Sequence, residues 1–342
     1  MLAETSAAAA ELGLGEAYRP WLSALDASAG DRDGESDTPI RSEADGEVMA
    51  RLGVAEQDAR VVLETATQLE ASPGLMLLLR RCRRLILDHL GDPGAPPLRL
   101  PQLPAALGPA GRCFPAHLFL ATLPATMTWQ RSLGIPEDVA WDSFNDLGRH
   151  MQIYRDVHAE TGVDEPWWLM LHLQGLMYEF GRLQFNLLRI GGPMAPASWY
   201  DAEAAAELGH GFRAGDDAIG VHIPESVRLD PQASNESVAA ARKFFPRYFP
   251  SPTRALAVCE SWLLDDQLRA YLPPTSNIIV FQRQFDLAPG WKPGDSDVAQ
   301  FVFRKPVAEF GTVPQRTTLQ RAVVSHLRTG GHWRVRCGWL RL

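Results

Sequence analysis

The sequence predicts an α+β protein in which a helical N-terminal domain precedes an α/β domain built on a mixed sheet. Two observations support this division. Up to about residue 180, apolar residues recur three or four positions apart, which is the period of an amphipathic helix. After Gly181 the period changes to two, as in a strand, beginning with Leu183, Phe185 and Leu187. A chain of 342 residues with 46% hydrophobic residues is long enough to form two cores.

Residues 1–46 form an acidic leader that we expect to be partly disordered. The first fifty residues carry eleven acidic and three basic side chains, which accounts for the whole formal net charge of −8. The segment 27–46 has too few apolar residues to offset chain entropy, so it predicts a disordered linker, and the Ala-rich segment Ser6–Leu25 predicts a loose helix. The rest of the chain is neutral, which argues against nucleic-acid binding.

Residues 47–180 make up the predicted helical domain. Its clearest helix is Pro136–Glu160, whose apolar residues lie mostly three or four apart. Pro136 suits the first turn of this helix and Gly162 suits its end. The segment Trp167–Phe180 is apolar on most sides and predicts a buried helix, but it is too short to span a membrane.

Residues 181–342 make up the predicted α/β domain. Short apolar runs separated by turn residues predict the order strand, strand, helix, strand, helix, strand, strand, helix, strand. The runs are Arg182–Ile190, Ala218–Glu225, Ser237–Phe249, Ala255–Leu264, Asp265–Leu272, Asn277–Leu287, Ala299–Lys305, Thr317–Arg328 and Trp333–Leu342.

Cysteine usage and charge exclude several classes of protein. The four cysteines are far apart and form no C-x-x-C pair, so neither a zinc site nor a disulfide framework is predicted. The N-terminus lacks the pattern of a secretory signal, which favours a cytoplasmic protein. The last 39 residues carry eight basic residues and one acidic residue. They form either a solvated surface or one that attracts phosphate or an acidic carrier protein.

Seven short strings in the second half of the chain carry a resemblance to a known family. They are Asp146–His150, Gly181–Asn186, Val221–Glu225, Phe244–Pro250, Cys259–Leu264, Ser276–Ile278 and Thr318–Ala322. In this order they resemble a bacterial family of acyltransferase-domain proteins, which pair a helical N-acyltransferase N-terminal domain with a C-terminal domain similar to the GNAT fold. The resemblance implies that acyl-CoA is the co-substrate and that no metal is needed.

The resemblance also implies where acyl-CoA binds. In the GNAT fold two central strands splay apart and hold the pantetheine arm, and the pyrophosphate lies at the N-terminus of the following helix. Here the strands correspond to Ala218–Glu225, with Val221 and Ile223, and to Ala255–Leu264. The loop Ser226–Ser237 would hold the pyrophosphate, with Ser234 or Asn235 as the N-cap of the helix. Arg247 is the best phosphate candidate on that helix.

This loop departs from the GNAT pattern, because the segment Ser226–Asn235 contains no glycine. Glycine lets a backbone approach a phosphate closely, and Asp230 would repel a pyrophosphate. The departure leaves three alternatives: a different mode of CoA binding, a carrier-protein thioester as the donor, or no cofactor.

His222 and Glu225 are candidates for the base that deprotonates an incoming ammonium group. They lie three apart and so face opposite sides of an ideal strand, but Pro224 disturbs the strand and can turn both toward one cleft. The alternative is a hydrogen-bonded, half-buried His222 and a surface Glu225. On the opposing strand, Cys259 is either a nucleophile or a small core residue. Ser261 or its neighbour Glu260 is a candidate to contact the thioester.

Four polar residues are candidates for binding the substrate. Arg149, His150 and Arg182 stand in apolar surroundings and can bind a carboxylate, since a guanidinium group offers a planar pair of donors. They are equally suited to bridge the two domains through backbone carbonyls. Gln282, on the predicted strand Asn277–Leu287, is a candidate to line the cleft.

The sequence therefore predicts a cytoplasmic enzyme that moves an acyl group from acyl-CoA, or from an acyl carrier protein, to an amine of a small molecule. The amine would attack the thioester directly in a ternary complex. One alternative is a non-catalytic binding or regulatory protein that kept the GNAT-like fold. Another is a cysteine hydrolase that uses Cys259 with His222, which is weaker because no strand-to-helix elbow presents the cysteine. No nucleic acid or membrane is predicted as a partner.

Overall fold

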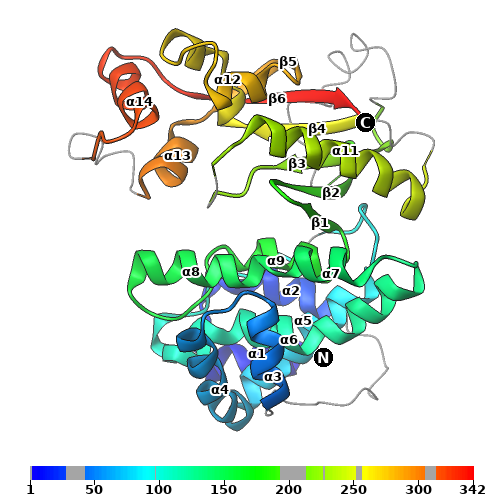
Figure 1. Ribbon diagram of the computed structural model, residues 1–342. Helices are drawn as coiled ribbons and strands as arrows, with labels where there is room; N and C mark the ends of the chain where they lie inside the picture. Colours follow the sequence, from blue (N-terminus) through cyan, green and yellow to red (C-terminus); the bar gives the residue numbers. More distant parts are fainter. Residues whose placement is uncertain are drawn as a thin grey trace. The chain divides into compact units, whose positions relative to one another are not determined.

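The computed structural model describes residues 2–27, 43–96, 98–192, 213–225, 228–251, 256–304 and 313–342. The chain divides into two compact units, Met1–Tyr178 and Glu179–Leu342. Figure 1 shows the first as a bundle of helices and the second as a mixed sheet with helices packed on it, which confirms the predicted α+β class. No helix among the described residues has both the length and the apolar character needed to cross a membrane.

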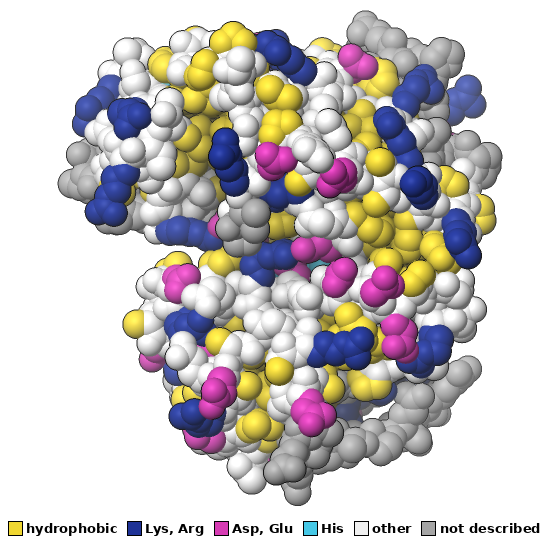
Figure 2. All heavy atoms as spheres, in the orientation of Figure 1, with side chains coloured by type: hydrophobic (Ala, Val, Ile, Leu, Met, Phe, Trp, Pro, Cys, Tyr) yellow, Lys and Arg dark blue, Asp and Glu magenta, His cyan; other side chains and the backbone are white. Residues whose placement is uncertain are grey.

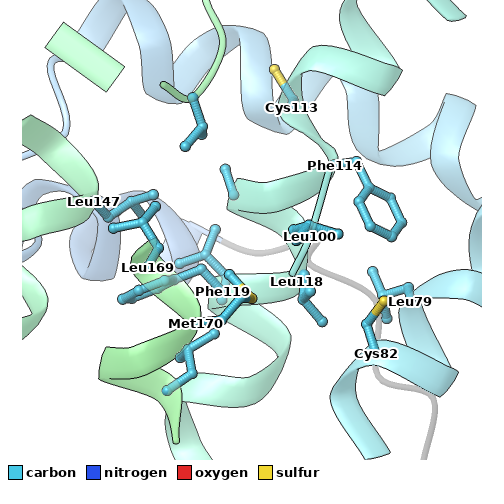
Figure 3. Packing of buried hydrophobic residues seen from close by; sticks show 14 of the residues in the cluster. Leu79, Cys82, Leu100, Cys113, Phe114, Leu118, Phe119, Leu147, Leu169 and Met170 are labelled. Atoms are coloured by element: carbon cyan, nitrogen blue, oxygen red, sulfur yellow. The ribbon is translucent and has the colours of Figure 1, made fainter. Parts of the chain in front are cut away.

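The first unit is built around one long buried helix, α6, which contacts α4, α5 and α9. Figure 3 shows apolar side chains of α5, α6, α8 and α9 meeting around Phe119. The acidic leader also contributes to this core, through Leu12, which directly follows α1, and through Trp21 and Leu25 of α2. Most of the predicted linker, residues 28–42, lies outside the described residues. The helices are α1 Leu2–Glu11, α2 Arg19–Ala27, α3 Glu43–Arg51, α4 Glu56–Ala71, α5 Pro73–Asp88, α6 Gly108–Ser132, α7 Glu137–Phe144, α8 Asp146–His158 and α9 Pro166–Leu173.

Two of the predicted helices differ from the structure. The segment expected to form one helix from Pro136 to Glu160 forms two, α7 and α8, which meet at Asn145. The segment Trp167–Phe180 is helical only to Leu173, because Gly175 adopts a left-handed conformation (φ 67°) that ends the helix. A Cβ atom on Gly175 would lie 2.2 Å from the Trp129 ring. The chain then continues as strand β1, Met177–Phe180.

Gly148 lets α8 pack directly against the backbone that follows α3. Its N–H donates to the Leu52 carbonyl at 3.2 Å, and a Cβ atom at this position would lie 2.3 Å from the carbonyl group of Gly53. We expect Gly148→Ala to lower the free energy of unfolding by about 1–3 kcal/mol, because two backbones would have to separate. Urea denaturation measures the loss. The matched control is Gly46→Ala in α3, where the new methyl group meets nothing. A Gly148→Ala protein as stable as Gly46→Ala would contradict the expectation.

The second unit contains a six-stranded sheet with the order β1-β2-β3-β4-β6-β5. β3 and β4 are parallel, whereas β2 with β3, β4 with β6 and β5 with β6 are antiparallel. The strands after β1 are β2 Leu183–Arg189, β3 Asp217–His222, β4 Leu256–Ser261, β5 Asp286–Pro293 and β6 Arg334–Arg341, and the helices are α11 Pro231–Tyr248, α12 Asn277–Gln282, α13 Asp295–Val298 and α14 Thr318–Arg328. The short 3₁₀ helices η4, Trp262–Leu264, and η5, Asp266–Ala270, follow β4.

Two predicted strands are wrong. Asn277–Leu287 begins as helix α12, which Ser276 caps by accepting a hydrogen bond from the Ile279 N–H, and a strand forms only from Asp286 onward. The run from Ala299 forms a π-helical turn that ends at Phe303. Short apolar runs of this length fit a buried helix as well as a strand, so their periodicity alone does not decide between them.

Candidate active site

The pairing of β3 with β4 is much shorter than the two strands themselves. β3 pairs with β2 over six residues, Asp217–His222, and β4 pairs with β6 over six residues, Leu256–Ser261. Between β3 and β4 only Ile219↔Ala257 and Gly220↔Val258 are paired. Parallel strands that continue side by side keep an evenly spaced ladder of hydrogen bonds, so the end of the ladder marks where the two strands part. Val221 and His222 lie beyond this point on β3.

The two faces of the sheet carry different chemistry at this point. Side chains alternate between the faces along a strand. Val221 shares a face with Phe185, whose ring lies 6.3 Å from that of Phe245 on α11, so this face is covered by the helix. His222 shares the opposite face with Asn186, which lies opposite Gly220 in the strand register. The polar groups of the candidate site are therefore gathered on the face away from α11.

His222 is held by a buried amide. Its Nε2 atom lies 2.7 Å from Oδ1 of Asn186, and the Nδ2 group of that amide donates to the Leu187 carbonyl at 3.0 Å. Asn186 is only 1% exposed, whereas His222 is half-buried. The imidazole is thus fixed in orientation and remains accessible. Asn186 lies within the string Gly181–Asn186 but was not predicted as a site residue.

Glu225 and Ser261, the other candidates at the strand ends, already have partners. Glu225 forms an ion pair with Arg304, which follows the π-helical turn and has φ 55°. The Ser261 hydroxyl accepts a hydrogen bond from the Leu263 N–H at 3.1 Å and caps η4. Glu260, next to Ser261, forms an ion pair with Lys292 of β5.

Cys259 faces α11 and is 1% exposed. Burial, with a smaller contribution from the neighbouring Glu260, raises the pKa of its thiol to about 12. A thiol with so high a pKa holds almost no thiolate at neutral pH, and the thiolate is the nucleophilic form. The structure therefore supports the reading of Cys259 as a core residue.

We expect Cys259→Ala to keep the acyl-transfer activity of the unchanged protein, because the thiol is buried away from the face that carries His222. Iodoacetamide should label Cys259 only when the protein is unfolded. Initial rates with saturating donor check the first expectation, and peptide mass mapping checks the second. Loss of activity in a folded Cys259→Ala protein would restore the cysteine mechanism.

The N-terminus of α11 is already occupied by its own chain. Asp230, rather than Ser234 or Asn235 as expected, is the N-cap, and its carboxylate accepts a hydrogen bond from the Ala233 N–H at 3.0 Å. Pro231 at the first helical position has no N–H. The Ser234 hydroxyl donates to the Asp230 carbonyl at 2.8 Å, whereas Asn235 is exposed. A carboxylate at this end leaves few donors for a pyrophosphate and repels it.

The other residues predicted to bind the cofactor are spread along the unit. Val221 is 1% exposed on β3, and Ile223 directly follows the strand and is half-buried. Arg247 lies in the last turn of α11, about 24 Å of helix from the first turn, with its guanidinium group over the Tyr248 ring. The structure therefore brings Val221 and Ile223 to the end of β3 and leaves Arg247 far from it. Ser226 and Val227 lie outside the described residues.

Arg182 and Gln282, predicted to contact the substrate, both donate hydrogen bonds to backbone carbonyls, and Gln282 also accepts one from the Arg269 side chain at 3.1 Å. Nε of Arg182 donates to the Arg228 carbonyl at 3.0 Å, which ties the start of β2 to the loop before α11. The Gln282 amide donates to the carbonyls of Leu263 and Asp265, both at 2.9 Å. Gln282 is 1% exposed, so it holds the turn that follows β4.

Arg149 and His150 lie in the first unit, around a buried carboxylate that the sequence did not identify. Asp146 is 1% exposed and stands at the start of α8. Arg149 forms an ion pair with it, and Nε2 atoms of His172 and His150 lie 3.0 Å and 3.5 Å from its Oδ2 atom. The Nδ1 group of His150 donates to the Asp164 carbonyl at 2.6 Å. We call Asp146, Arg149, His150 and His172 the Asp146 cluster.

The Asp146 cluster has strongly perturbed ionisation. Burial opposes the charged form of Asp146, but His150 and His172 outweigh it and hold the pKa of this carboxyl well below its ordinary value. Burial likewise opposes the charged form of His150, and Asp146 outweighs it and raises the pKa of this imidazole. Both shifts favour the charged pair, so the cluster is a buried ion-pair network.

Two further features of the molecule are its surface charge and its possible metal ligands. Figure 2 shows Lys and Arg side chains scattered over one face of the second unit, among hydrophobic and uncharged ones. No group of three or more His, Cys, Asp or Glu residues suited to hold a metal ion occurs in the described part of the chain.

Comparisons with known proteins agree with this architecture. The N-acyltransferase N-terminal domain family matches residues 45–175, and the GNAT-like C-terminal domain family matches residues 177–340. A solved acyltransferase in complex with decanoyl-CoA and teicoplanin is 34% identical, with a TM-score of 0.86 over 99% of both chains. The same values hold for an acyltransferase in complex with CoA and 10C-teicoplanin, and for an acyltransferase mutant in complex with octanoyl-CoA. No curated protein sequence matches the chain.

A helical domain followed by a GNAT-like sheet, matched over 99% of the chain by solved acyltransferases, makes this protein an acyltransferase. The chain belongs to the acyltransferase family that joins an N-acyltransferase N-terminal domain to a GNAT-like C-terminal domain. The family predicted from the seven strings is thereby confirmed.

Proposed function

We propose that this protein transfers an acyl group from acyl-CoA to an amine of a small molecule, by direct attack within a ternary complex. The observation that carries the proposal is the short pairing of β3 with β4, with His222 on the end of β3 beyond it. An acyl thioester lying between the strand ends would place its carbonyl carbon next to an accessible imidazole. Acyl-CoA as the donor agrees with the cytoplasmic location predicted from the sequence.

The donor would lie with its pantetheine arm against the ends of β3 and β4. Backbone groups of Val221 and Ile223 would hydrogen-bond the amides of the arm, in the way that a neighbouring strand would. The cap formed by Asp230 argues that the phosphates of CoA bind away from the first turn of α11. The solved relatives contain octanoyl-CoA and decanoyl-CoA, which supports a donor with a medium-length acyl chain.

The chemical step needs one proton acceptor and one leaving group. The neutral amine attacks the thioester carbonyl and forms a C–N bond, and the carbonyl electrons move to oxygen. Nδ1 of His222 takes the proton that the nitrogen loses. Collapse of the intermediate breaks the C–S bond and releases CoA as a thiolate, which the imidazolium can reprotonate. Neither Glu225 nor Cys259 has a part in this step, because the first is paired with Arg304 and the second is buried.

The acceptor is proposed from the relatives. One is in complex with decanoyl-CoA and teicoplanin, and another with CoA and 10C-teicoplanin, which are the pairs expected before and after transfer of a ten-carbon acyl group. An amine on a molecule of the teicoplanin type is therefore the first acceptor to test. Arg149 and His150 are bound to Asp146, so we do not include them in the acceptor site.

The test combines binding and turnover. Calorimetric titration with acetyl-, octanoyl- and decanoyl-CoA should give the tightest binding with the two longer chains, since each added CH₂ group buries apolar surface. Incubation with decanoyl-CoA and teicoplanin should release free CoA thiol and give an acylated product by mass spectrometry. Decanoyl groups on an acyl carrier protein form a second arm, and turnover with that donor alone would replace acyl-CoA as the donor. Absence of heat and of turnover with all donors would leave a binding protein with this fold.

A further inference from the structure

We propose that Asn186 is a positioning residue for acyl transfer. By accepting a hydrogen bond from Nε2 of His222, it fixes the tautomer and the direction of the imidazole, so that Nδ1 carries the lone pair that accepts the proton. Gly220 makes this possible by leaving room for the amide. This inference rests on the proposed function of His222 as the base, and it assigns roles to two residues that are not themselves expected to touch the substrate.

The direction of the hydrogen bond follows from the two contacts of the Asn186 amide. Its Nδ2 group faces the Leu187 carbonyl at 3.0 Å, and a carbonyl can only accept, so Nδ2 is the donor there. The atom that faces His222 at 2.7 Å is then Oδ1, which can only accept. Nε2 of His222 must therefore carry the hydrogen. In a neutral imidazole the other ring nitrogen, Nδ1, is then the acceptor.

Gly220 is required for space rather than for backbone conformation. In the register of β2 and β3, Asn186 lies opposite Gly220, and His222 is two residues farther along the same face. A Cβ atom on Gly220 would lie 1.9 Å from Oδ1 of Asn186 and 3.1 Å from Nε2 of His222. The amide thus crosses the position of the missing side chain to reach the imidazole. Any larger residue at position 220 would displace the amide.

The carboxylates of Glu179 on β1 and Glu260 on β4 are bound to other side chains. Gln184, which lies opposite His222 in the register, donates to the Glu179 carboxylate at 2.9 Å. On β4, the carboxylate of Glu260 is paired with Lys292. The Asn186 amide is neutral, so its hydrogen bond with His222 sets the direction of the ring without adding a charge. An imidazole oriented by a carboxylate would instead be biased toward its protonated form.

Asn186→Leu and Asn186→Asp separate the two effects of the amide. Asn186→Leu fills a similar volume and removes the hydrogen-bond acceptor, so the imidazole of His222 is no longer held in its reactive direction. We therefore expect kcat to fall about 10–100-fold, with no change in the KM for decanoyl-CoA. Asn186→Asp keeps an acceptor and adds a charge. It should retain most of kcat at high pH and move the acidic limb of the kcat/KM profile to higher pH, because the carboxylate raises the pKa of His222.

Gly220→Ala tests the space requirement and has a matched control. It should lower kcat as Asn186→Leu does, because it displaces the amide. Gly338→Ala on β6 also introduces a crowded methyl group into this sheet, 2.9 Å from Leu264 and Phe285, but opposite Cys259 and so on the face away from the Asn186 amide. It should reduce stability without the same loss of kcat. Equal losses of kcat in both glycine variants would overturn the role of Gly220.

A spectroscopic measurement tests the tautomer without turnover. With ¹⁵N-labelled histidine, the imidazole signals of His222 should show a protonated Nε2 and an unprotonated Nδ1 in the unchanged protein, and a mixture of tautomers in Asn186→Leu. His222→Ala identifies the signals. An Nδ1–H tautomer in the unchanged protein, or an unchanged kcat and tautomer in Asn186→Leu, would overturn the inference while leaving acyl transfer intact. Full activity in His222→Ala would instead remove the proposed base itself.

Discussion

His222→Ala should lower kcat for acyl transfer by about 10²–10⁴-fold, which is the usual contribution of a positioned general base. The half-buried imidazole stands at the end of β3 rather than in the apolar core, so the variant should fold. The KM for decanoyl-CoA should change little, because in the proposed binding mode backbone groups of the strand ends hold the donor. Steady-state rates with decanoyl-CoA and teicoplanin measure the loss, and calorimetry measures donor binding.

Two controls make this result specific to proton transfer. His222→Gln keeps a hydrogen-bonding side chain toward Asn186 but cannot accept the proton, so it should be as slow as His222→Ala. Added imidazole should restore part of the rate to His222→Ala, since a small base can enter the vacated space. If Glu225→Gln lost as much activity as His222→Ala while remaining folded, the base would be reassigned to Glu225 despite its ion pair with Arg304.

Asp146→Leu should lower the free energy of unfolding by about 3–5 kcal/mol, as expected when one partner of a buried ion pair is removed and the other charge remains. His172 is fully buried and would lose the carboxylate that lies 3.0 Å from its Nε2 atom, and Arg149 would lose its ion pair. Urea denaturation followed by circular dichroism measures the loss. Asp146→Asn is the matched control, because it keeps the shape and removes the charge.

The same cluster gives the first unit a stability optimum in pH. The pKa of Asp146 is lowered on folding, so its contribution is complete above the unfolded value of about 3.9 and is lost as the pH falls through the folded pKa. The pKa of His150 is raised, so its contribution is complete below the unfolded value of about 6.5 and is lost as the pH rises through the folded pKa. Stability from the cluster should therefore be greatest between about pH 4 and pH 6.5. A flat profile in the unchanged protein, or one that persists in Asp146→Asn, would contradict this assignment.

The elements that the sequence predicted well are those with a clear period. Alternation of side chains predicts β2 and β3, and the runs Trp333–Leu342 and Thr317–Arg328 correctly predict β6 and α14. The elements that the sequence predicts wrongly are short. The four residues of β1 belong to the apolar segment that follows Trp167, and α12 contains only four consecutive apolar residues, Ile278–Phe281, which fit a strand as well as a helix.

The candidate site was predictable only in part, because its decisive contacts depend on the register between strands. The sequence predicts His222 as a candidate from its place at a strand end, but its bond to Asn186 joins residues 36 apart in sequence. Asp146 and His172, 26 apart, meet because α8 packs against α9, which is also a long-range contact. The cap of α11 was visible, since an Asp before a Pro at the start of a helix is a known N-terminal signal, yet the serine and asparagine that follow were preferred.

The brief contact between β3 and β4 divides the six strands into two trios, β1-β2-β3 and β4-β6-β5, joined by two residue pairs. Each trio keeps its own internal ladders, so remodelling one need not disturb the other. Substitutions on β4 could widen the seam for bulkier acyl chains while the trio that carries Asn186, Gly220 and His222 retains its geometry. Under the proposed function, the acyl-chain length that the enzyme accepts can therefore evolve separately from the proton transfer at His222.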